Sequence, residues 1–139
     1  MAESIKHIEL VACIVRYVRA HYKGIQSVAI RHDMPGYIGC DKPPLIGDYR
    51  PDLFAIDAPL TTTIIGEAKT AGDLETNHTH MQLAHFIRFL CLQTNPVLIL
   101  GVPWQARARG LGLVNSIIDN RGIEPSLISV VIVDDVQVN

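Results

Sequence analysis

Three side chains near the middle of the chain are of the types that hydrolyse phosphodiester bonds. Pro51-Asp52 is followed, after a gap of 14 residues, by Glu67-Ala68-Lys69. Two neighbouring carboxylates repel each other unless a cation lies between them, and Mg²⁺ is often held by one or two carboxylates together with waters and a substrate phosphate. A nearby lysine can orient or help to deprotonate an attacking water, and it can neutralise charge that builds on a phosphate. These residue types predict metal-assisted phosphodiester hydrolysis if the fold brings them together.

The two segments that carry these residues have the composition of a β-hairpin. Residues 51–57 and 61–69 are predicted as strands because apolar and β-branched residues dominate them. With 58–61 as the loop, counting outward places Asp52 opposite Glu67. Directly opposed side chains have Cβ atoms ~4.5–5.5 Å apart. The hairpin therefore brings the two carboxylates together.

Lys69 lies two residues beyond Glu67 and therefore shares the same face of its strand. A helix is predicted directly after this strand, from a cap at Asp73 to about Leu92. The three candidate site residues thus come together at one end of the hairpin. The alternative is that Asp52 is a turn acid and that Glu67 and Lys69 form an exposed pair on a strand.

The remaining segments alternate between helix and strand. Ser4 can cap a helix that runs to about Tyr22 with an apolar stripe along it. Further strands are predicted at 25–31, 96–102 and 127–133, a third helix at 104–119, and a long connection rich in Gly and Pro at 33–50. The order α-β-β-β-α-β-α-β predicts an α/β fold with a mixed sheet and helices on both faces. Its middle strands form an antiparallel hairpin, and its last two form a parallel pair with a right-handed crossover.

The composition fits a single globular domain spanning residues 1–139. Apolar residues make up 48% and charged residues 19%, and a chain of this length buries roughly two thirds of its unfolded surface. The formal net charge of −2 lacks the positive excess of proteins that coat duplex DNA, so nucleic-acid contact must come from local patches or through a bound cation. With no signal-peptide core and no apolar run near the ~20 residues of a membrane span, we expect a cytoplasmic protein without a membrane partner.

The pattern Pro51-Asp52 followed by Glu67-x-Lys69 resembles the signature of the PD-(D/E)XK nuclease superfamily. The restriction-endonuclease-like fold of that superfamily has the core order α-β-β-β-α-β, which the predicted elements match over about residues 4–102. The resemblance implies divalent-metal-dependent cleavage of nucleic acid, usually DNA. It implies Asp52 and Glu67 as metal ligands and Lys69 as the catalytic lysine. The expected metal is Mg²⁺, for which Mn²⁺ can substitute.

The resemblance adds two further candidate site residues. The segment Gln-Leu-Ala-His-Phe at 82–86 is similar to the Gln-x-x-x-Tyr helix motif of RecB-type helicase-nucleases, which implies a site role for Gln82. Phe86 stands where tyrosine is usual and lacks its phenol hydroxyl. Glu9 on the first helix matches the position from which many members add another carboxylate to the metal site. The alternatives are a polar helix surface for Gln82 and a capping or solvated position for Glu9.

Histidines on the predicted second helix raise the alternative of zinc. His78, Gln82 and His85 share a helix face at i, i+4 and i+7, and His80 lies nearby in sequence. Catalytic zinc sites usually use three protein ligands at once, and no suitable Cys or His set follows with the right spacing. A position of His78 or His85 along the active-site cleft is therefore favoured over a zinc site.

Basic residues near the site are candidate phosphate contacts. Arg50, adjacent to the site, is favoured, and Lys42 is also considered. The sequence thus predicts a Mg²⁺-dependent nuclease that acts on DNA. Little chain is left over to read a base sequence. This favours a structure-selective endonuclease that cuts branched or junction DNA as a homodimer, as in DNA repair or recombination. The alternative is a non-catalytic module that binds nucleic acid or protein, but such a module gains nothing from two facing carboxylates.

Overall fold

The computed structural model of the chain describes residues 4–22, 29–32, 41–56 and 61–136. Its helices are α1 (Ile5–His21), α2 (Asn77–Leu90) and α3 (Arg107–Asn120). Its strands are β1 (Ala29–His32), β2 (Leu53–Ile56), β3 (Thr63–Ala68), β4 (Pro96–Val102) and β5 (Ser129–Asp134). Short 3-10 helices are η1 (Asp73–Glu75), η2 (Trp104–Ala106) and η3 (Pro125–Leu127). Within these residues, no helix combines the length and apolar character needed to cross a bilayer.

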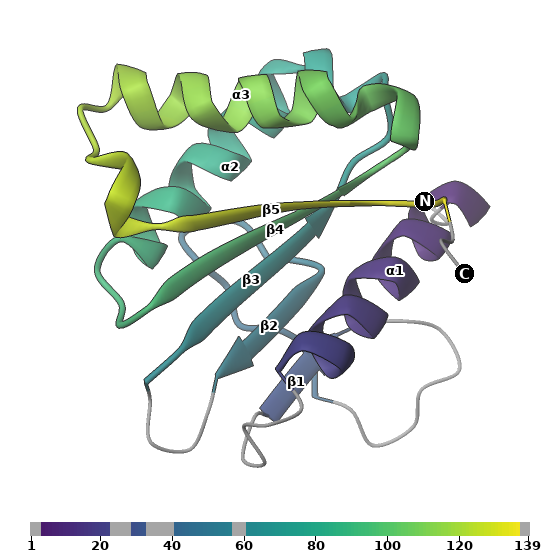
Figure 1. The fold of residues 1–139 in the computed structure, drawn as a ribbon, viewed down its shortest axis with the longest axis horizontal. Helices are drawn as coiled ribbons and strands as arrows, with labels where there is room; N and C mark the ends of the chain where they lie inside the picture. Colours follow the sequence, from purple (N-terminus) through teal and green to yellow (C-terminus); the bar gives the residue numbers. More distant parts are fainter. Residues whose placement is uncertain (1–3, 23–28, 33–40, 57–60, 137–139) are drawn as a thin grey trace.

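The described strands form one mixed sheet in the order β1-β2-β3-β4-β5, as Figure 1 shows. β1, β2 and β3 are antiparallel neighbours, whereas β3, β4 and β5 are parallel neighbours. This confirms the predicted α/β class, the hairpin and the parallel pair at the end. Leu53 pairs with Gly66, so the same register places Asp52, directly before β2, opposite Glu67 as predicted. The predicted turn at 58–60 lies outside the described residues, as do parts of the predicted strand at 25–31 and of the connection at 33–50.

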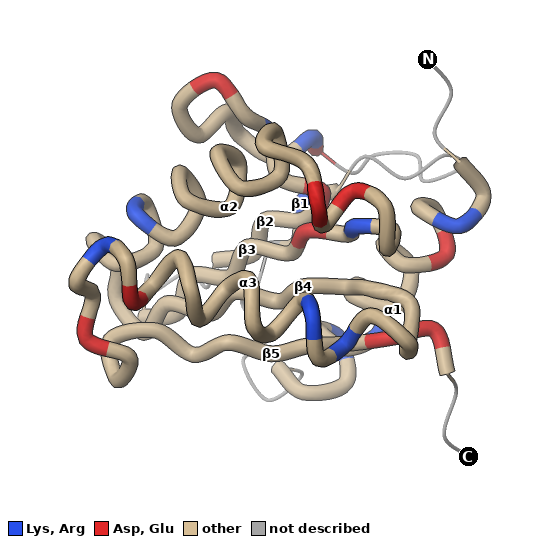
Figure 2. Tube along the Cα trace, turned by 90° about the horizontal axis from the view of Figure 1, so that it is seen from above, with Lys and Arg blue, Asp and Glu red and all other residues tan. Residues whose placement is uncertain are grey.

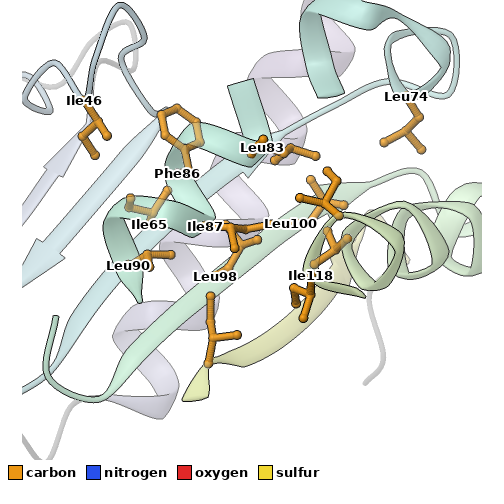
Figure 3. Packing of buried hydrophobic residues seen from close by; sticks show 14 of the residues in the cluster. Ile46, Ile65, Leu74, Leu83, Phe86, Ile87, Leu90, Leu98, Leu100 and Ile118 are labelled. Carbon is orange, nitrogen blue, oxygen red and sulfur yellow. The ribbon is translucent and has the colours of Figure 1, made fainter. Parts of the chain in front are cut away.

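Helices cover both faces of the sheet (Figure 1). α1 packs on one face through an apolar stripe made of Leu10, Val11, Ile14, Val15 and Val18. α2 and α3 cover the other face, where Phe86, Leu83 and Ile87 pack with Ile65, Leu98 and Leu100 (Figure 3). Every residue of β3 and β4 is buried as a result. Glu67 is a residue of β3, so the packing of this strand buries its side chain.

Glycines let α1 approach the sheet closely. A Cβ at Gly66 would lie 2.6 Å from Ile14 Cγ2, and one at Gly101 would lie 2.9 Å from Ile14 Cδ1. A glycine within a strand often marks such a close approach of another element. Because Gly66 directly precedes Glu67, the packing of α1 sets the position of the strand where the site is built.

The first helix has its predicted cap, but the second begins later than predicted. Ser4 Oγ accepts from the His7 N–H, which confirms the start of α1. Asp73 lies in η1 instead of capping α2, and its carboxylate accepts from the Thr70 N–H at 3.3 Å. Thr76 caps α2 in its place. β5 also begins later than predicted, after the residues that form η3.

Candidate active site

Asp52 and Glu67 lie face to face where β2 begins and β3 ends. The Asp52 main-chain N–H donates to Glu67 Oε1 at 3.1 Å. Asp52 Oδ2 in turn accepts from the Ala68 N–H at 2.8 Å. The Glu67 side chain is 2% exposed, whereas that of Asp52 is 18% exposed. The hairpin backbone thus holds two carboxyl groups together, one of them out of solvent.

This proximity separates the acidities of the two carboxyl groups. Burial raises the pKa of Glu67 well above its usual value, and the negative charge of Asp52 raises it further, against the opposing effect of Lys69. Burial also acts to raise the pKa of Asp52. Hydrogen bonds with His7, with Glu67 and from the Ala68 N–H outweigh burial and leave the pKa of Asp52 below its usual value. Without a cation, Glu67 therefore takes up a proton at higher pH than Asp52 does.

Lys69 extends from the end of β3 toward α2. Its Nζ donates to Gln82 Oε1 at 2.5 Å and lies 3.5 Å from Glu67 Oε2. Its main-chain N–H donates to the Gly101 carbonyl oxygen at 2.9 Å, which ties it to β4. Gln82 is buried and so is not a polar surface residue of α2. The structure therefore brings together four of the predicted residues, Asp52, Glu67, Lys69 and Gln82.

His7 on α1 contributes a contact that its residue type and spacing did not predict. Its Nε2 lies 3.2 Å from Asp52 Oδ1, where the ring N–H donates to the carboxylate. His7 precedes Leu10 and Ile14 by one and two helical turns, so it extends the buried stripe of α1. This spacing from Leu10 and Ile14 is the feature of the sequence that could have identified His7 as a residue facing the sheet. Glu9, two positions further along a helix with 3.6 residues per turn, points to a different side.

The other predicted contacts lie around the site. Glu9 is exposed, and its carboxylate lies 3.8 Å from Lys6 Nζ, in a pair at i, i+3 on α1. The structure therefore does not group Glu9 with Asp52 and Glu67. Arg50 and Lys42 are both exposed in the chain that leads into β2, and Arg50 is separated from Asp52 by one residue.

The first turn of α1 is tied to the end of the sheet that carries the site. Lys6 Nζ donates to the Asp135 carboxylate just after β5. Asp135 Oδ1 also accepts from the Trp104 N–H at 3.0 Å, and Arg107 donates to Asp134 at 2.7 Å. Acidic and basic positions intermingle at this end of the molecule (Figure 2). These bonds hold α1, β5 and α3 together at the end of the sheet where His7 contacts Asp52.

The donor set fits a hard divalent cation. Among the described residues, no group of three or more His, Cys, Asp and Glu side chains is arranged to hold a metal ion. The site instead offers the oxygens of Asp52 and Glu67, and each ionised carboxylate can accept about four hydrogen or metal bonds. Mg²⁺ commonly takes one or two carboxylates and completes its shell with waters and substrate phosphate. Two adjacent carboxyl groups, of which Glu67 is buried and Asp52 partly exposed, match that requirement.

The histidines of α2 lie on either side of Gln82. His78 is exposed and His85 is partly exposed. The His85 Nδ1 N–H donates to the Met81 carbonyl oxygen at 2.8 Å. Phe86 is fully buried in the core between α2 and the sheet (Figure 3), so it contributes packing and not a site contact.

No family model, curated protein or solved structure matches this chain. The functional argument therefore depends on the geometry of the residues around Asp52 and Glu67.

Proposed function

We propose that this protein is a divalent-metal-dependent nuclease that hydrolyses phosphodiester bonds of nucleic acid. The observation that carries the proposal is the grouping of Asp52, Glu67 and Lys69 at one end of the hairpin, with Glu67 Oε2 3.5 Å from Lys69 Nζ. Placing a buried acid such as Glu67 beside a second carboxylate is costly unless opposite charge compensates the pair. A chain that needed only a stable hairpin would place apolar residues there.

The order of the elements supports a restriction-endonuclease-like arrangement of the PD-(D/E)XK type. From α1 to β4 the described elements run α-β-β-β-α-β apart from the short 3-10 helix η1, and the acidic pair lies where β2 begins and β3 ends. Gln82 on α2 accepts a hydrogen bond from Lys69, which supports a site role for Gln82.

The residues of the site have different roles in the proposed reaction. Asp52 and Glu67 would hold Mg²⁺, for which Mn²⁺ can substitute, with both carboxylates ionised. When bound, the cation supplies Lewis-acid stabilisation of the phosphoryl oxygens and lowers the pKa of water. Lys69, oriented by Gln82, neutralises charge that builds on the scissile phosphate and helps to orient or deprotonate the attacking water. His7 fixes the orientation of Asp52.

DNA cut according to its shape is the proposed substrate. Every described helix and long strand belongs to one α/β unit, so the described residues include no separate recognition subdomain. The net charge of −2 also favours contacts concentrated at the site over a broad basic surface. A homodimer that engages branched or junction DNA fits both features, and DNA repair or recombination is the process in which such an enzyme would act.

The test is cleavage of supercoiled, linear, single-stranded and four-way-junction DNA in EDTA, Mg²⁺ or Mn²⁺. The variants Glu67→Ala and Lys69→Ala are compared with Glu124→Ala and Arg88→Ala, which alter exposed residues away from the site. Metal-dependent cutting that is lost only in the first two variants supports the proposal. A folded wild type that neither cuts any substrate nor binds metal would indicate a non-catalytic binding module.

A further inference from the structure

Three aromatic rings gather on the face of α2 that carries Gln82. His78 and His85 lie four residues before and three residues after Gln82, positions that share one helix face. Tyr49, in the segment that leads into β2, contacts both. Its ring centroid lies 5.5 Å from that of His78 and 5.1 Å from that of His85. Because Gln82 accepts from Lys69 Nζ, this aromatic cluster of Tyr49, His78 and His85 adjoins the proposed catalytic lysine.

The aromatic cluster is held in a fixed arrangement. Ile46 and Tyr49 exchange main-chain hydrogen bonds of 2.7 and 3.2 Å, which close a tight turn. Gly47 in this turn has a φ of +62°, and a Cβ there would lie 3.1 Å from His85 Cδ2. The bond from His85 Nδ1 to the Met81 carbonyl oxygen sets the orientation of the imidazole. A rigid aromatic surface binds a flat ligand with little loss of side-chain entropy.

The aromatic cluster is also accessible. His78 is exposed, and Tyr49 and His85 are partly exposed. Tyr49 meets both imidazoles at steep angles, 68° and 61° between the planes. In an edge-to-face contact, only one of the two rings has a face covered, whereas stacking covers a face of both rings. The contacts of Tyr49 with the two imidazoles therefore leave ring faces open for a ligand to stack on. Arg50, directly after Tyr49, adds an exposed cation that can contact a phosphate.

We propose that the aromatic cluster binds an unpaired nucleobase of the substrate beside the phosphodiester bond that the site hydrolyses. This inference rests on the proposed nuclease function and adds a substrate class, namely nucleic acid with unpaired nucleotides at the cleavage position. A base inside a duplex has neighbouring bases on both faces and cannot stack on the cluster. An unpaired base can stack on tyrosine or imidazole rings, and such stacking is tolerant of base identity.

The experiment measures binding without cleavage. Fluorescence anisotropy in EDTA compares a labelled single-stranded oligonucleotide with a blunt duplex of the same sequence. We expect the wild type to bind the single strand more tightly. We expect His78→Ala to weaken single-strand binding roughly five-fold or more, the effect of losing one stacked base, while duplex binding is unchanged. Tyr49→Phe keeps the ring and should retain binding, whereas Tyr49→Leu should weaken it.

His80→Ala is the matched control. His80 is also an exposed histidine of α2, but it lines a groove of about 390 Å³ between α2 and α3, with Ile117 and Arg121. We expect this variant to bind both oligonucleotides like the wild type. Equal affinity of the wild type for single strand and duplex, or equal effects of His78→Ala and His80→Ala, would overturn the inference.

The failure of this inference can be distinguished from failure of the nuclease function. Metal-dependent cleavage of duplex DNA that His78→Ala leaves unchanged overturns the role of the aromatic cluster and keeps the nuclease. Selective single-strand binding that depends on His78, in a protein that cuts nothing, supports the base-binding surface and overturns the nuclease.

Discussion

The main chain of Asp52 donates a hydrogen bond to the side chain of Glu67, with 3.1 Å between the nitrogen and Oε1. The Ala68 N–H donates in return to Asp52 Oδ2 at 2.8 Å. Each carboxylate is thus bound by the strand that carries the other. The hairpin backbone therefore positions both acids before any cation or substrate arrives, and such prior positioning is what a catalytic site requires.

Glu67→Gln should raise the stability of the metal-free protein at neutral pH and abolish cleavage. The pKa of Glu67 is raised by burial and by the negative charge of Asp52. The contribution of Glu67 to the stability of the fold is therefore fully present below the ordinary pKa of 4.5, and it is lost as pH rises through the folded-state pKa. Glutamine resembles the protonated acid and does not titrate. The stability difference between variant and wild type should therefore grow with pH.

Urea unfolding in EDTA at about pH 5 and about pH 8 measures this difference through the transition midpoints. Asp52, whose pKa is lowered, changes stability in the opposite direction and only at more acidic pH. A stability difference that is the same at both pH values would show that the pKa of Glu67 is not raised in the folded protein.

Lys69→Met should reduce the rate of cleavage by roughly 10²–10⁴-fold, the usual contribution of a group that transfers or stabilises a proton in the transition state. Methionine keeps much of the apolar stem of lysine and removes the charge. Because Lys69 is not a metal ligand in the proposed site, Mn²⁺ binding measured by calorimetry should persist. Arg88→Met, at an exposed position of α2, is the control. Equal cleavage by the two variants would remove Lys69 from the mechanism.

The hairpin and the sheet could be predicted because local patterns determine them. The register of Asp52 against Glu67 follows from counting back from a turn, and the apolar run of β4 gives its bounds directly. The grouping of Asp52, Glu67 and Lys69 at this end of the hairpin was therefore predictable from residue types and spacing. The start of α2 was not, because Asp73 and Thr76 are both good caps. Contacts of Asp73 with Thr70 decide between them.

The contact made by α1 depends on its rotation about its own axis, which the spacing of Glu9 from the motif does not fix. Packing of Ile14 against Gly66 and Gly101 fixes that rotation. It turns His7 toward Asp52 and leaves Glu9 beside Lys6. Tertiary packing of this kind is not encoded in any one segment.

His7→Phe should therefore lower activity more than Glu9→Gln. Loss of the His7 hydrogen bond frees Asp52 to rotate, and groups that orient a metal ligand typically contribute 10–100-fold to metal affinity or activity. Phenylalanine preserves the ring packing. We expect Glu9→Gln to change the rate less than about two-fold, in line with the small contribution of an exposed ion pair. Mn²⁺ titration and cleavage rates measure both effects, and a larger loss in Glu9→Gln would favour Glu9 as the residue of α1 that serves the site.

Gly66→Ala should destabilise the protein by about 1–3 kcal/mol, the usual cost of overpacking a core. The new Cβ would lie 2.6 Å from Ile14 Cγ2 and 3.1 Å from Leu53 Cβ, so α1 must move away from β3. Gly112→Ala is the matched control, since its Cβ meets nothing within 4 Å. In the middle of α3 it should stabilise by roughly 0.5–1 kcal/mol through better helix propensity.

Urea unfolding of both variants tests this contrast, and a double-mutant cycle identifies the contact. Ile14→Ala removes the atom that the new methyl group strikes. Gly66→Ala combined with Ile14→Ala should then be less destabilised than the sum of the single variants, by roughly 0.5–3 kcal/mol as for other residues in contact. If the free-energy changes of the two single variants simply add in the double variant, α1 is not in close contact with β3 at Gly66. The position of His7 relative to Asp52 would then need another explanation, because that close packing is what sets the rotation of the helix.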